Sequence, residues 1–374
     1  MPSALISDLE DAEQIKEVNL LLDFCEKGDH AGAKRIIQNG NLPSLSLQDD
    51  DGWTALHYAT NSGNKDLVEF LLSKGALWSM IDKIGHTAGD IAFSYNDSEI
   101  YSLIFDEGLR SEMLRLTLVR KFKQKQLDGT ESEENNEGSS SVSDNAKFLS
   151  SKLTYQNNSV GQPICVDEEG NAVMMGWESM IMKETAQKLC SGLENSADFE
   201  LSVLNIGFGL GIIDGYLQSY RPARHVIVEA HPDVLSFMRQ NGWHKKPGVV
   251  IYPGRWQSFL KEIEDGSIEG NFDVVYWDTF SENYDDLKVV FDNLFSLLSG
   301  PNARFSWFHG LGATSRTIYD IYTEIAEIDL RDAGLKISWY EVDVGGGEAI
   351  WEGIKRRYWN IPCRYRLPIC RYDV

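Results

Sequence analysis

From about Phe148 to the end of the chain, short apolar runs alternate with longer amphipathic stretches. The apolar runs predict strands at 200–206, 225–229, 248–252, 272–277 and 303–308. The stretches between and after them predict helices at 211–219, 232–241, 256–264, 284–298 and 316–331. Such alternation is typical of a doubly wound α/β sheet. Two later runs, 336–342 and 349–356, have no long helix between them and predict an antiparallel hairpin at one edge of the sheet.

The first third of the chain follows a different period. Gly85 follows Gly52, and Gly108 follows Gly75, each after 33 residues, which is the period of ankyrin repeats. Residues 51–59 also match the ankyrin signature T-P-L-H-x-A closely, with alanine in place of proline. The pattern predicts stacked helix pairs that bury their apolar faces only against their neighbours.

An earlier unit, running through Gly28 and ending at Gly40, matches the pattern by half and brings the number of predicted repeats to three. In this architecture Thr54 and His57 tie the turn to the next repeat, so we expect them to have a structural role. The basic stretch 109–127 predicts a capping helix at the end of the repeats.

The composition changes abruptly after this helix. Residues 128–144 are rich in Ser, Glu, Asn and Gly and have almost no apolar side chains, so they cannot bury enough surface to become ordered. We therefore divide the chain into ankyrin-like repeats with their capping helix at 1–127, a disordered acidic linker at 128–147, and an α/β domain at 148–374.

The charge and the cysteines limit the classes of partner and compartment. The net charge of −22 disfavours a nucleic-acid partner, because phosphates would be repelled, and it suits a cationic partner. The five cysteines form no CxxC pair and the seven histidines are dispersed, so we expect no metal site. We also expect no secretory leader, no membrane-spanning helix, and a cytoplasmic and nuclear location.

The first strand of the α/β domain runs into the glycines Gly207, Gly209 and Gly211. A strand, a glycine turn and a helix let a cofactor approach the backbone, and an acid at the end of the next strand can accept bonds from ribose hydroxyls. Glu229 lies at that position, 22 residues after Gly207. A dinucleotide fingerprint would need glycine where Ile212 stands, so the pattern favours S-adenosylmethionine over NAD.

Two further carboxylates are candidates for the acceptor side of such a site. Asp278 follows the fourth predicted strand, at the sheet edge that borders the ligand crevice in open α/β folds. Glu178 lies among apolar residues before the sheet. The alternatives are a loop or helix-capping aspartate and a solvated glutamate on an amphipathic helix.

Together these residues resemble a known family. The segments that carry the resemblance are 177–178, 204–209, 225–229, 254–256 and 276–280. They are similar to the guanidinoacetate N-methyltransferases and, more closely, to the fungal and plant-type protein arginine N-methyltransferase 2 family, which joins ankyrin-like repeats to such a domain. The resemblance implies a Rossmann-like class I methyltransferase sheet of seven strands with an antiparallel closing hairpin, preceded by an all-α repeat domain.

The resemblance also implies roles for single residues. It implies that Glu178 and Asp278 hold the guanidino group and that Glu229 binds the ribose of S-adenosylmethionine. The other cofactor residues that it implies are Met182, Gly207, Phe208, Gly209, Gly211, Ala230, Gly254, Trp256 and, in a second role, Asp278. The chain departs from its relatives at 179–182, where they have Thr-Pro-Tyr-Met, and in the inserted Trp277.

The activity that the resemblance implies is methylation of the internal δ-nitrogen of arginine in a ribosomal protein. A guanidinium arrives protonated, and two carboxylates grip its planar fork through charge-assisted hydrogen bonds. The competing hypotheses are a small-molecule guanidino methyltransferase, an ankyrin scaffold with an inactive methyltransferase domain, and an NAD oxidoreductase using His231 or His309. The protein-binding repeats disfavour the first, and the retained Glu178 and Asp278 disfavour the second.

Overall fold

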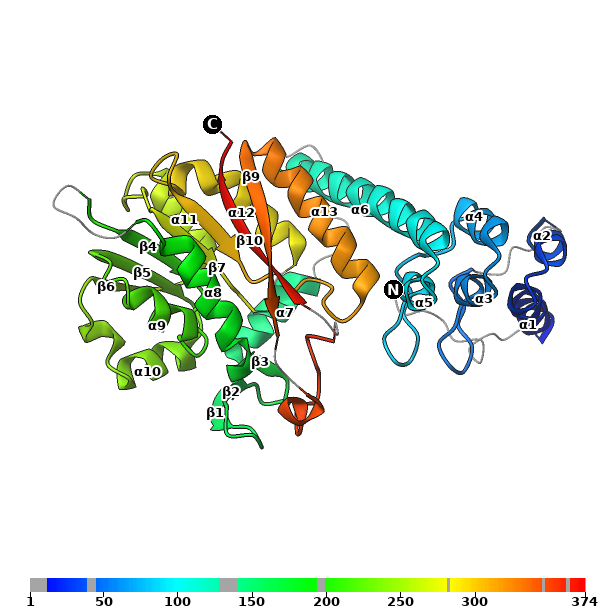
Figure 1. The fold of residues 1–374 in the computed structure, drawn as a ribbon, viewed down its shortest axis with the longest axis horizontal. Helices are drawn as coiled ribbons and strands as arrows, with labels where there is room; N and C mark the ends of the chain where they lie inside the picture. Colours follow the sequence, from blue (N-terminus) through cyan, green and yellow to red (C-terminus); the bar gives the residue numbers. More distant parts are fainter. Residues whose placement is uncertain are drawn as a thin grey trace. The chain divides into compact units, whose positions relative to one another are not determined.

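The computed structural model describes residues 12–38, 45–127, 140–193, 199–280, 283–344, 347–360 and 364–373. The chain divides into two compact units, one made of Met1–Ser132 with Gly312–Ile325 and the other of Glu133–Leu311 with Ala326–Val374 (Figure 1). Within the described ranges, every helix is too short or too polar to cross a lipid bilayer.

The first unit is built from three helix pairs, as the 33-residue period predicts. The pairs are α1 (Ala12–Glu26) with α2 (His30–Gln38), α3 (Ala55–Asn61) with α4 (Lys65–Ser73), and α5 (Ala88–Ser94) with α6 (Ser98–Leu127). Helix α3 packs against both α1 and α5, and α4 packs against α6. Leu56, Leu67 and Leu71 are buried between the pairs, so each repeat completes the core of its neighbour.

Thr54 and His57 have the structural role that the repeat pattern predicts. The Thr54 backbone N–H donates to His57 Nδ1 at 3.1 Å, and the Thr54 hydroxyl lies 2.8 Å from the same atom. His57 Nε2 lies 3.2 Å from the carbonyl oxygen of His86, which belongs to the next repeat. Burial lowers the pKa of His57, so the ring stays neutral and links two repeats.

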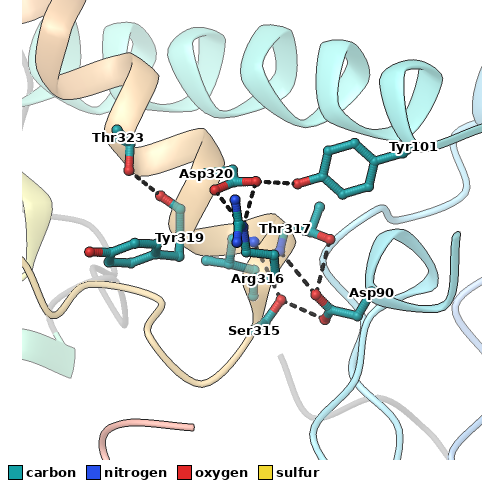
Figure 2. Close-up of polar contacts among 9 residues, drawn as sticks. Asp90, Tyr101, Ser315, Arg316, Thr317, Tyr319, Asp320 and Thr323 are labelled. Atoms are coloured by element: carbon teal, nitrogen blue, oxygen red, sulfur yellow. Dashed lines mark hydrogen bonds and ion pairs between the residues drawn. The ribbon is translucent and has the colours of Figure 1, made fainter. Parts of the chain in front are cut away.

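Residues Gly312–Ile325 belong to the first unit, although the sequence assigns them to the α/β domain. They include the start of α13 (Arg316–Asp332). Asp90 of α5 accepts hydrogen bonds from the Ser315 hydroxyl at 2.7 Å and from the Thr317 N–H at 3.0 Å (Figure 2). The Tyr101 hydroxyl donates to Asp320 at 2.5 Å. The apolar period predicts the helix but cannot tell which surface the helix meets.

Removing the Asp90 carboxylate is expected to destabilise the first unit. It accepts five hydrogen bonds, from the N–H and hydroxyl groups of Thr87 and Thr317 and from the Ser315 hydroxyl. Asp90→Ala would leave these donors without their acceptor, at a cost of about 3 kcal/mol in the free energy of unfolding. Urea titration followed by circular dichroism measures this free energy, and Asp66→Ala, at an exposed position of α4, is the control. Equal midpoints for the two variants would refute this role.

The predicted linker ends earlier than expected. Its residues 128–139 lie outside the described residues, but residues 140–147 form the first part of helix α7 (Ser140–Ser150), which corrects the prediction of disorder there. Phe148 explains the order of this helix. Its ring lies 5.0 Å from that of His231 and 4.7 Å from that of Phe280, so α7 is fixed by packing on the second unit's own core rather than by its polar composition.

The second unit contains the predicted seven-stranded sheet. The strands lie in the order β6 (Val249–Pro253), β5 (Arg224–Glu229), β4 (Ser202–Ile206), β7 (Val274–Trp277), β8 (Arg304–Trp307), β10 (Arg364–Tyr372) and β9 (Leu335–Asp343). The first five are parallel, and β10 is antiparallel to both of its neighbours. The central strands β4 and β7 are buried along almost their whole length because helices cover both faces of such a sheet.

The helices of this unit follow the predicted alternation. After α7 they are α8 (Ser179–Cys190), α9 (Ile212–Gln218), α10 (Pro232–Gln240), α11 (Trp256–Glu264), α12 (Tyr284–Leu297) and the second part of α13. Helix α8 packs against α9, and α11 packs against α12. A short turn of 3₁₀ helix, η3 (Trp243–Lys245), follows α10.

The closing hairpin is present, but its second strand was predicted in the wrong place. Residues 349–356 form no strand and include part of the 3₁₀ turn η4 (Glu348–Trp351), whereas β10 pairs with β9 over nine residues from Arg364 to Tyr372. Pro368 explains the error, because proline argues against a strand inside a sheet. The bridge from β10 to β8 lies at Cys370 and Phe305, two residues beyond this proline.

A small antiparallel sheet precedes the large one and was not predicted. Its strands are β1 (Thr154–Asn157), β2 (Pro163–Val166) and β3 (Ala172–Met175). The ring of Tyr155 stacks on that of Phe237 with centroids 4.0 Å apart, which holds the small sheet on α10. Strand β3 leads directly into the 3₁₀ turn η2 (Gly176–Glu178), so this sheet determines where Glu178 lies.

Candidate active site

The glycine loop follows β4 and is joined to the end of β7. The Gly207 N–H donates to the Val228 carbonyl at 2.9 Å, and the Asp278 N–H donates to the Ile206 carbonyl at 2.8 Å. A Cβ atom on Gly207 would lie 1.8 Å from the Asp278 carbonyl oxygen, and its φ is +93°. Only glycine fits there, and this close approach brings residue 278 beside the loop.

The small sheet contacts the same loop. The Leu210 N–H lies 3.1 Å from Met174 Sδ, and a Cβ on Gly209 would lie 2.5 Å from that sulfur. Gly211, with a φ of +70°, is the residue from which α9 begins. The Phe208 side chain is buried in an apolar cluster with Trp243, 5.0 Å between ring centroids. The Phe208 side chain therefore packs into this cluster, and Phe208 contributes only its backbone to the glycine loop.

Glu229 ends β5 and is held by backbone amides. Its Oε1 accepts from the His231 N–H at 2.7 Å, and its Oε2 accepts from the Phe208 N–H at 3.0 Å. Burial raises the pKa of this carboxyl group, and the backbone donors of His231, Phe208 and Ala230 oppose the rise. A carboxylate has about four acceptor sites, so the backbone orients Glu229 and leaves capacity for hydroxyl groups. This capacity fits the ribose of an adenosine cofactor.

The other predicted cofactor residues lie in different surroundings, and of these Gly254 is bonded to Glu229. The Gly254 N–H donates to the Glu229 carbonyl at 2.9 Å, and Trp256 is buried at the start of α11. Met182, on α8, is fully buried, and its sulfur lies 3.3 Å from the Tyr276 hydroxyl. Glu229, Gly254 and the glycine loop are thus joined by hydrogen bonds, whereas Met182 packs against β7.

In the structure Glu178 and Asp278 lie close enough for the charge of Glu178 to raise the pKa of Asp278. Glu178 is 3% exposed at the end of η2, and Asp278 is partly exposed at the end of β7. Burial raises the pKa of Asp278 well above its usual value, and the charge of Glu178 raises it further. Burial also raises the pKa of Glu178 to about 7, although hydrogen bonds from Tyr358 and Met175 oppose the rise.

The backbone and one tyrosine orient Glu178. The Met175 N–H donates to Glu178 Oε1 at 3.0 Å, and the Tyr358 hydroxyl donates to the same oxygen. The burial of Glu178 does not fit the solvated glutamate of the alternative interpretation, whereas Asp278 does lie in a loop, directly after β7, where the charge of Glu178 affects its pKa. Sequence reasoning missed Tyr358, because it lies 180 residues from Glu178 and belongs to no motif.

The histidines that an oxidoreductase would need are engaged in the fold. His231 Nδ1 accepts from the Asp233 N–H at 3.1 Å, and its Nε2 lies 3.1 Å from the Phe148 carbonyl. His309 is buried, which lowers its pKa to about 3. Both histidines are thus poor candidates for acid–base catalysis. Across the described residues, no group of three or more His, Cys, Asp or Glu side chains could hold a metal ion.

The repulsion between the two carboxylates has a consequence for stability. A carboxyl group whose folded pKa is raised stabilises the fold while protonated and loses that contribution as the pH rises from the unfolded value of about 4 toward the folded value. For Glu178 the folded value is about 7.

We therefore expect Asp278→Asn to melt at a higher temperature than the wild type at pH 8, with the difference vanishing toward pH 4. Asp332→Asn, at an exposed position of α13, is the matched control and is expected to melt as the wild type does. Thermal melts at both pH values measure this. A lower melting temperature of Asp278→Asn at pH 8 would show that the carboxylates do not repel each other.

Comparison with known proteins matches both parts of the chain. Ankyrin repeats, in three copies, match residues 20–112, and the guanidinoacetate N-methyltransferase family matches residues 154–297. Protein arginine N-methyltransferase 2 of Cryptococcus neoformans var. neoformans serotype D (strain B-3501A) is 40% identical over 349 residues, covering 88% of each chain. The protein of the same name from Aspergillus oryzae is 36% identical, covering 82% of this chain and 77% of its own. That of Yarrowia lipolytica is 31% identical, covering 99% of this chain and 95% of its own.

Proposed function

The chain belongs to the protein arginine N-methyltransferase 2 family, and we propose that it transfers a methyl group from S-adenosylmethionine to the δ-nitrogen of an arginine in a ribosomal protein. Its membership of the family makes it a methyltransferase that acts on arginine in proteins. The observation that supports a guanidino acceptor is the pair of carboxylates Glu178 and Asp278, the second of which lies beside the glycine loop. The δ-nitrogen and the ribosomal protein are what the family resemblance implies.

The fit of the loop to an adenosine cofactor supports S-adenosylmethionine. Glu229 would hold the ribose hydroxyls, and Gly254 and Trp256 would lie toward the adenine, since Gly254 is bonded to the backbone of Glu229. When bound, the cofactor supplies a methyl group on a positively charged sulfur. The glycines at 207, 209 and 211 keep the backbone of the loop free of side chains, so a ligand can approach it closely.

The two carboxylates are suited to a guanidinium acceptor. The guanidinium of arginine stays protonated at any physiological pH, so it brings a positive charge between Glu178 and Asp278 and relieves their repulsion. Hydrogen bonds from the fork to both carboxylates draw positive charge toward the bound nitrogens and align the remaining nitrogen for attack. Because the pKa of Glu178 is raised to about 7, this group is also suited to accept the proton that the nitrogen releases.

The repeats favour a protein acceptor over a small guanidino compound. A small molecule needs only the pocket, whereas the three repeats of the first unit offer the kind of extended surface that ankyrin arrays use to bind proteins. We place the activity in the cytoplasm and the nucleus, where a ribosomal protein is accessible before it is assembled.

The test compares acceptors under the same conditions. The protein is incubated with labelled S-adenosylmethionine and, separately, with a ribosomal-protein fraction and with guanidinoacetate. We expect label in a protein band and little on guanidinoacetate, and fragmentation of the labelled arginine is expected to place the methyl group on the δ-nitrogen. Label on guanidinoacetate alone would favour the small-molecule enzyme, and label on a terminal nitrogen would refute the δ-nitrogen assignment.

A further inference from the structure

The segment between β9 and β10 is anchored beside Glu178. We call its residues 347–360 the strap. Trp351 and Trp359 of the strap are buried, and their ring centroids lie 5.9 Å and 6.1 Å from that of Trp177, the residue before Glu178. The strap is therefore fixed by its two tryptophans to the same turn, η2, that carries the glutamate.

The strap is also bonded to the small sheet. The Lys355 N–H donates to the Gly170 carbonyl at 3.1 Å, in the turn between β2 and β3, and the Ser159 hydroxyl donates to the Ala349 carbonyl at 3.1 Å. Since β3 leads into η2, the strap and the small sheet together surround the backbone that presents Glu178.

Between Trp351 and Trp359 the strap places Tyr358 against Glu178. The hydroxyl donates to Oε1, which already accepts the Met175 N–H. The Tyr358 ring lies 5.2 Å from that of Trp351 and 6.0 Å from that of Trp177, so it has little freedom to turn away. Among the described residues, both donors to Glu178 bond to Oε1, which leaves Oε2 for a ligand.

We propose that Tyr358 is a positioning residue, which holds Glu178 Oε1 so that Oε2 faces the arginine acceptor. This inference rests on the proposed function, because it takes Glu178 to bind the guanidinium. The tyrosine itself need not touch the arginine. Its hydroxyl fixes one oxygen of the carboxylate, and the ordered carboxylate then makes its bond to the guanidinium without first losing rotational freedom.

The groups that face Glu178 come from three segments. They are Tyr358 of the strap, Asp278 after β7 and the Tyr276 hydroxyl of β7. Burial raises the pKa of Tyr276, and the charges of Asp278 and Glu178 raise it further. Of these, Tyr358 donates a hydrogen bond to the carboxylate and lowers its pKa. Loss of the hydroxyl removes this stabilisation of the ionised form, so the pKa of Glu178 is expected to rise further.

The test is the pH dependence of kcat/KM for the protein acceptor in Tyr358→Phe, made in the full chain. We expect kcat/KM at pH 7 to fall about tenfold, because a hydrogen bond to a charged group is lost, and the acid limb of the profile to move to higher pH. Cofactor affinity is expected to stay unchanged. Tyr340→Phe, on β9 of the same hairpin, is the matched control and is expected to keep the wild-type profile.

The pH profile separates positioning from mere support of the fold, since a packing defect would lower activity without moving the acid limb. A second readout is the double variant with Glu178→Gln, in which loss of the Tyr358 hydroxyl is expected to cause no further loss. A wild-type profile in Tyr358→Phe, with Glu178→Gln inactive, would overturn this inference alone. Activity in Glu178→Gln would instead overturn the proposed role of Glu178.

Discussion

Glu178→Gln is expected to lower kcat/KM for the arginine acceptor at least about 30-fold, because truncating one charge of a desolvated pair costs about 2–5 kcal/mol. The amide has nearly the shape of the carboxylate, so the bond from the Met175 N–H can be kept while the charge is lost. The cofactor residues around Glu229 are not changed, and the affinity for the cofactor is expected to stay within about twofold.

Asp278→Asn is expected to lower kcat/KM for the arginine acceptor to the same extent, since the proposed function has Glu178 and Asp278 bind the same guanidinium. Glu184→Gln, at a partly exposed position of α8, is the matched control and is expected to leave kcat/KM unchanged, since the proposed function gives its carboxylate no role. Steady-state rates with a fixed acceptor protein, together with calorimetric cofactor titrations, separate the two effects. If both Glu178→Gln and Asp278→Asn methylate at the wild-type rate, the acceptor assignment is wrong.

Glu229→Ala is expected to weaken cofactor binding about 100-fold, since charge-assisted hydrogen bonds to both ribose hydroxyls would be lost. The substitution also removes the acceptor of the Phe208 N–H and the His231 N–H, so the ends of β4 and β5 lose a common anchor. The cofactor affinity of Glu229→Gln, which keeps one acceptor oxygen, is expected to lie between that of the wild type and that of Glu229→Ala.

Isothermal titration calorimetry of the free protein with S-adenosylmethionine measures this effect. Glu264→Ala, at an exposed position in the last turn of α11, is the control and is expected to bind as the wild type does. Wild-type affinity in Glu229→Ala would mean that the cofactor is held elsewhere or that the carboxylate has only a structural role.

The parts of the fold that were predictable are those in which burial is periodic. Helix α11 spans Trp256–Glu264, as the apolar pattern indicates, and the central strands differ from their predicted bounds by one or two residues. The strands of the small sheet are too short to show a period, and Pro368 conceals β10. Helix α7 is ordered through Phe148, a tertiary contact that its polar sequence cannot reveal.

The site was predictable where its residues follow strands or belong to a motif. Gly207, Glu229 and Asp278 each lie at the end of a parallel strand, so the topology of the sheet brings them to one edge. Glu178 was found through its family motif rather than through its surroundings. Tyr358 reaches the site from the strap, and the spacing of side chains along the sequence carries no information on such a contact.

The central claim is that this chain methylates arginine in a protein, and the identity of the labelled amino acid tests it most directly. The full chain is incubated with labelled S-adenosylmethionine and a cell extract, and the labelled band is hydrolysed to its amino acids. We expect label in a monomethylated arginine, and no label when Asp278→Asn replaces the wild type. Label in lysine or in nucleic acid would contradict it.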